Sequence, residues 1–221
     1  MQQGTKARSF SPLFFPFADS FLCCFRGGHL HILQWLVSTQ GCSPHEMSCY
    51  IAASHGHLSV VQWLINDHQA FMEQNTIDAA ARSGRLDIVQ WCREQGCPWD
   101  WRACAVAAQN GQVKVLKWLR ANGFPWNART CAYAAKGGKL KVLKWAYKHG
   151  CPLTELCCAC AAQSGHFRIL KWLRSNGCPW DSLTTEAAAR SKRASNAACL
   201  KWALDNGCPR SERRPFSEVN V

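Results

Sequence analysis

The amino-acid sequence predicts an all-α solenoid of about seven stacked helix-turn-helix units. Seven tryptophans recur at steps of 28, 28, 27, 27, 27 and 30 residues: Trp35, Trp63, Trp91, Trp118, Trp145, Trp172 and Trp202. A glycine stands seven residues before each of the first six, and an alanine pair precedes five of these glycines. A fixed period of this length is typical of repeat proteins, in which each unit packs against its neighbours.

The segment before each of these glycines is expected to form the first helix of a unit. Alanine pairs such as Ala107 and Ala108 let neighbouring helices approach closely. The glycine that follows, here Gly111, can close the last turn of the helix in the left-handed conformation. A helix followed by a tight turn is therefore expected at the start of each unit.

The segment after the glycine is expected to form the second helix. Residues 58–65 and 113–120 place apolar side chains three, four and six positions apart, as in an amphipathic helix of about two to three turns. In several units Gly-Cys-Pro follows, and proline cannot continue a helix. Ordering one such unit costs on the order of 40 kcal/mol, so a single helix pair cannot fold alone and the units must stack.

Two segments resemble the core of an ankyrin repeat: AASHGHLSVVQWL at 52–64 and AAQSGHFRILKWL at 161–173. The units are about six residues shorter than an ankyrin repeat, and its Thr-Pro-Leu-His signature is thinned to Thr130 and Cys131. The missing stretch builds a projecting β-hairpin in that family, so short loops are expected instead. The resemblance covers residues 21–210. The repeats are similar to short Trp-bearing arrays of protists and large DNA viruses, and this likeness implies binding of a macromolecule.

We expect one continuous array over residues 21–210, an irregular N-terminal segment or cap over residues 1–20, and a polar C-terminal tail over residues 211–221. Lys6 and Arg8 precede a phenylalanine-rich stretch that could be a secretory signal. Two prolines and an aspartate interrupt that stretch, and no small-residue cleavage pattern follows, so secretion is not expected. No run of 18 apolar residues predicts a transmembrane segment.

The 15 cysteines do not predict a disulfide framework. Five of them follow the second glycine of a unit and form a column: Cys42, Cys97, Cys151, Cys178 and Cys208. Neighbouring units lie about 8 to 10 Å apart, whereas a disulfide needs Cα atoms within about 7 Å. Phe124 fills the same position in one unit, which indicates that the position needs an apolar side chain. Reduced cysteines favour an intracellular, cytoplasmic location, with the nucleus as the other open one.

Motifs for catalysis or metal binding are weak. Cys157 and Cys160 have CxxC spacing, but a structural zinc site normally needs a second pair. Three histidines follow the inter-helix glycine where other units carry Arg, Gln or Lys, so turn hydrogen bonding is expected: His29, His57 and His166. No triad spacing or phosphate-binding glycine loop stands out. We expect no enzyme activity, no cofactor, no metal and no small-molecule substrate.

The positive charge is confined to the C-terminal half. Residues 1–110 contain 7 basic and 8 acidic residues, whereas residues 111–221 contain 19 and 6. Periodic basic residues are expected to align on the solvent face of the second helices as a basic strip: Lys114, Lys117, Lys141, Lys144, Arg168, Lys171 and Lys201. The strip is either a solubilising face or a binding site for an acidic protein, nucleic acid or another anionic surface.

The seven repeating tryptophans are expected to pack between units rather than to stack on bases. Three further tryptophans in the loops either anchor a partner or hold the loop to the core: Trp99, Trp126 and Trp180. Variable polar residues follow the alanine pairs, where the resembled family has its concave groove: Gln109, Asn110, Lys136, Gln163 and Ser164. The leading prediction is a protein-protein interaction scaffold that binds through groove and loops. The alternative is polyanion binding through the basic C-terminal half.

Overall fold

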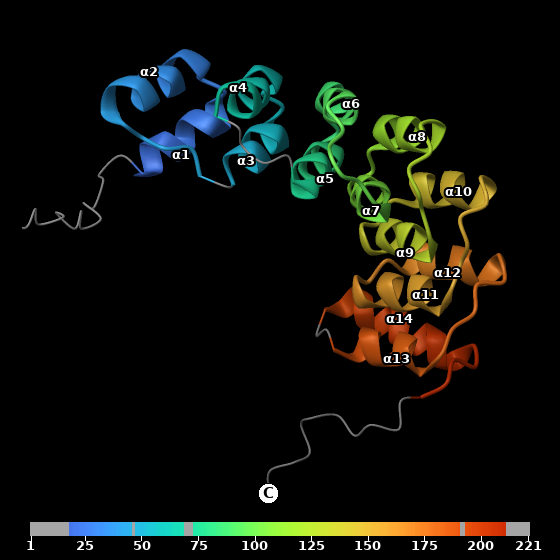
Figure 1. The fold of residues 1–221 in the computed structure, drawn as a ribbon. Helices are drawn as coiled ribbons and strands as arrows, with labels where there is room; N and C mark the ends of the chain where they lie inside the picture. The colour runs from blue at the N-terminus through green and yellow to red at the C-terminus, as the bar shows by residue number, and fades with distance from the viewer. Residues whose placement is uncertain (1–17, 46, 69–72, 191–192, 211–221) are drawn as a thin grey trace, which may run out of the picture.

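The computed structural model describes residues 18–210 except 46, 69–72 and 191–192. These residues form fourteen helices and contain no β-strand, which confirms the predicted all-α architecture of about seven helix pairs and short loops. The pairs stack side by side into a curved array, with α1 at one end and α13 and α14 at the other (Figure 1). No helix in the described part of the chain is both long and apolar enough to cross a membrane.

The helices form two layers. The inner helices, one from the start of each pair, are α1 Ala18–Gly27, α3 Ser48–His55, α5 Gln74–Ser83, α7 Trp101–Asn110, α9 Ala128–Lys136, α11 Glu155–Gln163 and α13 Ser182–Ala189. The outer helices are α2 Leu30–Gln40, α4 Leu58–His68, α6 Leu86–Glu94, α8 Val113–Ala121, α10 Leu140–Lys148, α12 Phe167–Ser175 and α14 Ala194–Asp205. The inner layer lines the concave side of the arch and the outer layer its convex side (Figure 1).

The first helix begins at Ala18, so the predicted boundary between residues 20 and 21 falls inside α1. The rest of the predicted N-terminal segment, residues 1–17, lies outside the described residues, as does the predicted tail over residues 211–221.

The curvature follows from the size of the side chains between the helices. Successive inner helices pack closely because small residues face one another there, and Ala80, Ala107 and Ala134 are fully buried. Successive outer helices meet less closely, and larger side chains such as Leu116 and Leu143 fill the core below them. Small residues on one side of the stack and large ones on the other bend it toward the inner layer.

The repeating tryptophans pack between units, as predicted, but most of them lie at the edge of the core. Trp63 is 7% exposed, and the next five are half-buried against the core. Trp35, in the first outer helix, is an exception because 53% of its surface is exposed. The leucines that follow them, such as Leu119 and Leu173, are fully buried. The tryptophans therefore cover a core that aliphatic side chains fill.

The glycine between the two helices of a pair is constrained twice. Gly56 and Gly138 both have left-handed backbones, with φ of +88° and +73°. In addition, a Cβ at Gly56 would lie 2.5 Å from Nε of Arg85. A Cβ at Gly138 would lie 2.8 Å from Cε1 of His166. Conformation and contact with the next repeat therefore both favour a residue without a side chain.

The residues after these glycines join successive repeats. Nε2 of His57 lies 2.7 Å from the carbonyl oxygen of Arg26, at the end of the preceding inner helix. Nε2 of Gln112 donates to the carbonyl oxygen of Arg82 at 3.2 Å. His166 makes the equivalent contact with a carbonyl oxygen of the preceding repeat. Helix ends leave carbonyl groups without helical partners, and these side chains satisfy them. The expected turn hydrogen bonding is confirmed for His57 and His166.

The loop after each outer helix prepares the start of the next inner helix. Asp100 accepts a hydrogen bond of 2.6 Å from the backbone N–H of Arg102, and Asp181 accepts one of 3.1 Å from that of Leu183. A side-chain oxygen at this position caps the helix N-terminus. The Trp-Asp pairs of the sequence therefore combine a packing residue with a helix cap.

Cysteines in the column also tie each loop to its own repeat. Sγ of Cys151 donates to the carbonyl oxygen of Asn127 at 3.3 Å, and Sγ of Cys178 to that of Thr154 at 3.2 Å. Both thiols are buried, and so is Phe124, which takes the same position in a neighbouring unit. The position therefore needs an apolar side chain, as predicted, and in these two units cysteine adds a weak hydrogen bond.

Candidate interaction surfaces

Most of the cysteines act as packing residues, since eleven of them are buried. All fifteen carry free thiols. Burial raises the pKa of the Cys104 thiol to about 12 and raises that of Cys160, so both are protonated at neutral pH. Cys157 of the CxxC pair is buried and Cys160 half-buried. Over the described residues, no three His, Cys, Asp or Glu side chains are grouped so that they could hold a metal ion.

The basic strip lies on the outer layer. All seven of its members are exposed, as expected for the solvent face of the outer helices. The helices α8, α10 and α12 carry three basic residues each and no acidic one. Within the described part of the chain, none of these nine side chains forms an ion pair. The strip is therefore a field of uncompensated positive charge.

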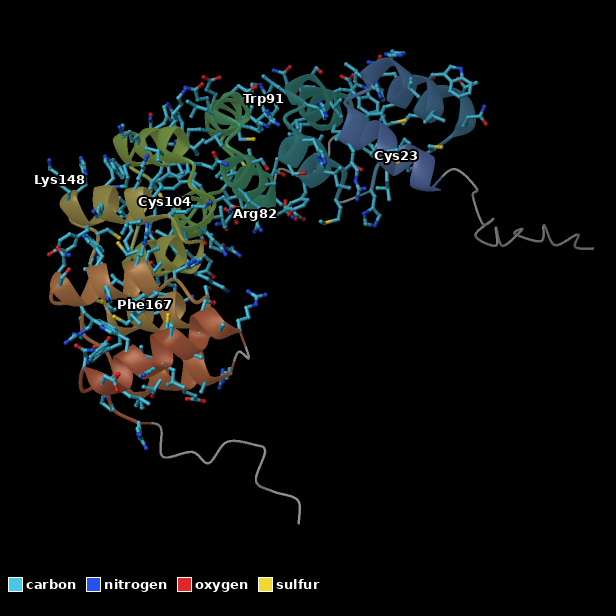
Figure 2. All side chains as sticks on the ribbon, turned by 180° about the vertical axis from the view of Figure 1, so that it is seen from behind. Cys23, Arg82, Trp91, Cys104, Lys148 and Phe167 are labelled. Atoms are coloured by element: carbon cyan, nitrogen blue, oxygen red, sulfur yellow. The ribbon has the colours of Figure 1, made fainter. Side chains whose placement is uncertain are left out.

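The two halves of the outer layer differ at equivalent positions. Gln62 and Gln90 stand where the later repeats have Lys117, Lys144 and Lys171. The outer helices of both halves face the convex side: in Figure 2, Trp91 and Lys148 lie on that side, whereas Arg82 lies on the concave side.

The three loop tryptophans are half-buried, and the structure groups them with the outer layer. An arginine from the preceding outer helix covers each ring: Arg93 lies 5.1 Å from the centre of Trp99, Arg120 4.1 Å from that of Trp126, and Arg174 4.1 Å from that of Trp180. Two of these rings also contact the repeating tryptophan of the following repeat. The ring centres of Trp126 and Trp145 are 5.9 Å apart, with an edge-to-face arrangement.

A pocket of about 310 Å³ opens beside Trp126, between α8 and α10. Its lining comes from the basic strip, the loop and the two outer helices: Lys117, Arg120, Ala121, Trp126, Trp145 and His149. The sequence left open whether the loop tryptophans anchor a partner or hold the loop to the core. The structure brings Trp126 together with Lys117 of the strip, because the loop folds back onto the outer helices.

The groove candidates lie at the C-terminal ends of the inner helices. Asn110, Lys136 and Gln163 are exposed, whereas Gln109 and Ser164 are half-buried. Nδ2 of Asn110 donates to a backbone carbonyl of its own helix at 2.9 Å. The structure thus places these residues on the inner layer, although the side-chain amide of Asn110 already donates a hydrogen bond within its own helix.

An aromatic and cationic cluster on the inner layer was not predicted. The guanidinium of Arg129 lies 5.0 Å from the centre of the Trp101 ring, and Trp101 meets Tyr133 edge to face at 6.4 Å. Nζ of Lys136 lies 6.0 Å from the Tyr133 ring. Trp101 and Tyr133 are both half-buried. Trp101 belongs to neither tryptophan column, and that departure was the available signal.

Two leucines continue this surface toward the C-terminus. Leu156 is 41% exposed and Leu183 is 53% exposed. They stand one and two periods of 27 residues after Arg129 and so occupy equivalent positions on α11 and α13. In a sequence such leucines resemble core residues, and only the alignment with Arg102 and Arg129 could have shown that they face outward.

Asp78 on α5 is the most perturbed carboxyl of the inner layer. Burial raises its pKa to about 6, and the nearby Arg102 only partly offsets this effect. Its Oδ1 is buried and has no hydrogen-bond partner among the described residues, and the same holds for Nε2 of Gln74. Oε1 of Gln74 accepts a hydrogen bond of 2.7 Å from Arg102. In the next three repeats the equivalent position is alanine, at Ala105, Ala132 and Ala159.

Comparisons with known proteins agree with this architecture. A family model described as ankyrin repeats, in three copies, matches residues 20–129. The crystal structure of the human ASB11 ankyrin repeat domain is similar, with a TM-score of 0.54 and 16% sequence identity over 86% of this chain and 98% of that chain. No curated protein matches the chain. The repeat pattern, the paired helices and the family match together show that the chain belongs to the ankyrin repeat family.

Proposed function

We propose that this chain is a non-catalytic scaffold that binds a protein partner through its concave surface. Ankyrin repeats are in general protein-protein interaction modules. The observation that carries the proposal is the pair of exposed leucines, Leu156 and Leu183, at equivalent positions of adjacent inner helices. Both leave apolar surface exposed on helices that pack against each other, and contiguous exposed apolar surface marks an interaction site.

The cluster beside the leucines supplies the residue types that dominate binding energy at interfaces. Tryptophan, tyrosine and arginine are enriched among such residues, and here Trp101, Tyr133 and Arg129 contact one another. Polar side chains form the rim, among them Lys136 and Gln163. The arrangement of an apolar and aromatic centre with a polar rim is that of a protein interface.

The chemistry of the surface indicates the kind of segment that fits it. Apolar side chains of the partner would contact Leu156 and Leu183, and a carboxylate would pair with the exposed Arg129. The loop tryptophans are not part of this surface, because their rings pack against the outer layer.

A double substitution, Leu156→Glu with Leu183→Glu, tests the proposal. The matched control is Ile32→Glu, which changes an apolar residue of similar exposure on the outer helix α2. Tagged chains would capture proteins from a cell extract at about 0.5 M salt, where screening weakens surface charge contacts. Proteins captured by the wild type and the control, and lost by the double variant, are expected.

Circular dichroism would show whether both variants keep the helical content of the wild type. If the double variant stays folded and captures the same proteins as the wild type, the concave surface is not the binding site.

A further inference from the structure

Arg120 on the outer layer is held in a fixed position. Its guanidinium lies 4.1 Å from the centre of the Trp126 ring, and NH1 donates to the carbonyl oxygen of Phe124 at 2.9 Å. A guanidinium has five N–H donors, so the others stay available for a ligand. A pre-positioned arginine suits phosphate, which it can bind through two parallel hydrogen bonds.

The pocket beside Arg120 combines positive charge with aromatic walls. Lys117 and His149 line it together with Trp126 and Trp145, and no acidic residue is among its lining residues. Its volume of about 310 Å³ is at the lower end of the range for small-ligand sites. A flat ring with an attached anionic group fits these walls better than an aliphatic chain does.

The same cluster recurs two repeats later. The guanidinium of Arg174 lies 4.1 Å from the centre of Trp180 and donates to the carbonyl oxygen of Cys178. The rings of Trp180 and Trp202 meet edge to face at 5.7 Å, as Trp126 and Trp145 do. Lys171 lies near the Trp202 ring, at 5.9 Å. The second cluster therefore repeats the lysine, the arginine and both tryptophans of the first.

The repeat between the two clusters interrupts the pattern. Leu153 replaces the loop tryptophan, and Tyr147 replaces the arginine. The exposed Lys141 and Lys144 of this repeat still continue the basic strip across the gap. The convex face of the C-terminal half thus presents two cationic aromatic clusters joined by a line of lysines.

The N-terminal half contains the same frame without the charge. Arg93 lies 5.1 Å from the centre of Trp99, but Gln90 stands where the later cluster has Lys117, and the acidic Glu94 follows Arg93 directly. An anion is therefore attracted less strongly there. This difference makes the Trp99 unit an internal control.

We propose that the convex face of the C-terminal half binds single-stranded nucleic acid, with one nucleotide at the pocket beside Trp126 and another at the equivalent cluster beside Trp180. The phosphates lie along the lysines and the edges of the arginines, and each base stacks on the guanidinium plane that rests on the Trp126 or Trp180 ring. A line of separate clusters fits a linear chain of repeated anionic and aromatic units. This proposal does not depend on the concave surface and adds a second kind of partner.

Other anionic partners fit the clusters less well. A duplex hides the faces of its bases, so it would leave the tryptophans unused. An acidic peptide supplies the charge without the rings. A membrane surface would need protruding aromatic side chains, whereas Trp126, Trp145 and Trp180 are half-buried.

Fluorescence anisotropy with a labelled oligouridylate tests the proposal, using a length of about 20 nucleotides, beyond the site size of a single binding module. The variant Trp126→Leu is conservative, because Leu153 already fills this position one repeat later. Loss of one stacked base is expected to weaken binding by about 5- to 100-fold. The matched change Trp99→Leu is expected to leave the affinity within about twofold, since Gln90 replaces the lysine there and Glu94 offsets the charge of Arg93.

Three competitors distinguish the possible ligands: heparin, polyglutamate and a duplex of the same length. The proposal expects single-stranded RNA to bind more tightly than all three at equal salt. It is overturned if Trp126→Leu and Trp99→Leu have equal effects, or if heparin or polyglutamate binds as tightly as the oligouridylate. Either result would show a charged surface without nucleotide pockets. Circular dichroism confirms that each variant is folded.

Discussion

The outer helices of the two halves share one frame and differ in what they expose. Buried aliphatic residues recur at the same positions, as Val60 and Leu64 do in α4 and Val115 and Leu119 do in α8. The position before the repeating tryptophan changes, from glutamine in the first three repeats to lysine in the last four. The stack therefore fixes the buried residues and leaves the exterior free to differ between its ends.

The lack of ion pairs makes this separation testable. Within the described residues, the basic side chains of α8, α10 and α12 form no salt bridges. Exposed charges of this kind contribute little to stability. Changes in the exterior should therefore affect binding, whereas changes in the frame should affect stability equally in both halves.

Reversal of three charges in the strip should produce the largest effect. The variant combines Lys117→Glu, Lys144→Glu and Lys171→Glu. Binding of the oligouridylate should weaken by about 100-fold or more at low salt, because cation-phosphate contacts release counterions and dominate the affinity. The slope of log affinity against log salt should also become less steep. Anisotropy titrations at several salt concentrations measure both quantities.

The control places the same new side chain at equivalent positions of the N-terminal half, Gln62→Glu and Gln90→Glu. Both variants should keep the wild-type helical content, since all these positions lie outside the core. If the N-terminal variant weakens binding as much as the strip variant does, although its change in net charge is smaller, then the strip is not the binding site, and the comparison between the halves fails.

Overpacking the inner layer should have a smaller effect, a loss of stability that is equal in the two halves. Ala81 and Ala135 are equivalent and fully buried. Replacing either one by leucine should lower the free energy of unfolding by about 1 to 3 kcal/mol, because the inner helices are closely packed there. Urea denaturation of both variants measures the loss. A clear loss for Ala135→Leu with none for Ala81→Leu would mean that the two halves do not share one frame.

The frame could be predicted from the sequence because its constraints repeat. Each glycine, alanine pair and tryptophan has one position per unit, so local chemistry and period indicate the same helices. The contact between Gly138 and His166 of the next repeat could not be predicted, because it depends on how two repeats are placed against each other. The cysteine thiols that donate to loop carbonyls were missed for the same reason.

The binding surfaces could be predicted only in part. The basic strip was found because exposed charges with a regular period must align in a stack. Leu156 and Leu183 were missed because an apolar residue in a helix predicts burial, and only the packing direction shows otherwise. For Trp126 the sequence left open whether the ring anchors a partner or holds the loop to the core, since the direction of a loop depends on what its side chain packs against.

Substitution of Asp78 should produce the smallest of these effects, a change in the pH dependence of stability. The inner helices of the two halves differ at this position. The raised pKa of about 6 means that the folded chain holds a proton on this carboxyl that the unfolded chain has already released, between pH 3.8 and about 6. Stability therefore falls as the pH rises through this window, and the cost is fully present above it. Solvent screens the partly exposed group, which keeps the effect small.

Asp78→Asn should therefore raise the melting temperature at pH 7.5 and leave it nearly unchanged near pH 3, where the wild-type carboxyl is mostly protonated in both states. Glu94→Gln, an exposed carboxyl of the same half, serves as the control and should change neither value. The next three repeats need no such test, because they place alanine at the Asp78 position. If Asp78→Asn lowers the melting temperature at pH 7.5, the carboxylate makes a favourable contact in the folded chain, and its burial is not a cost.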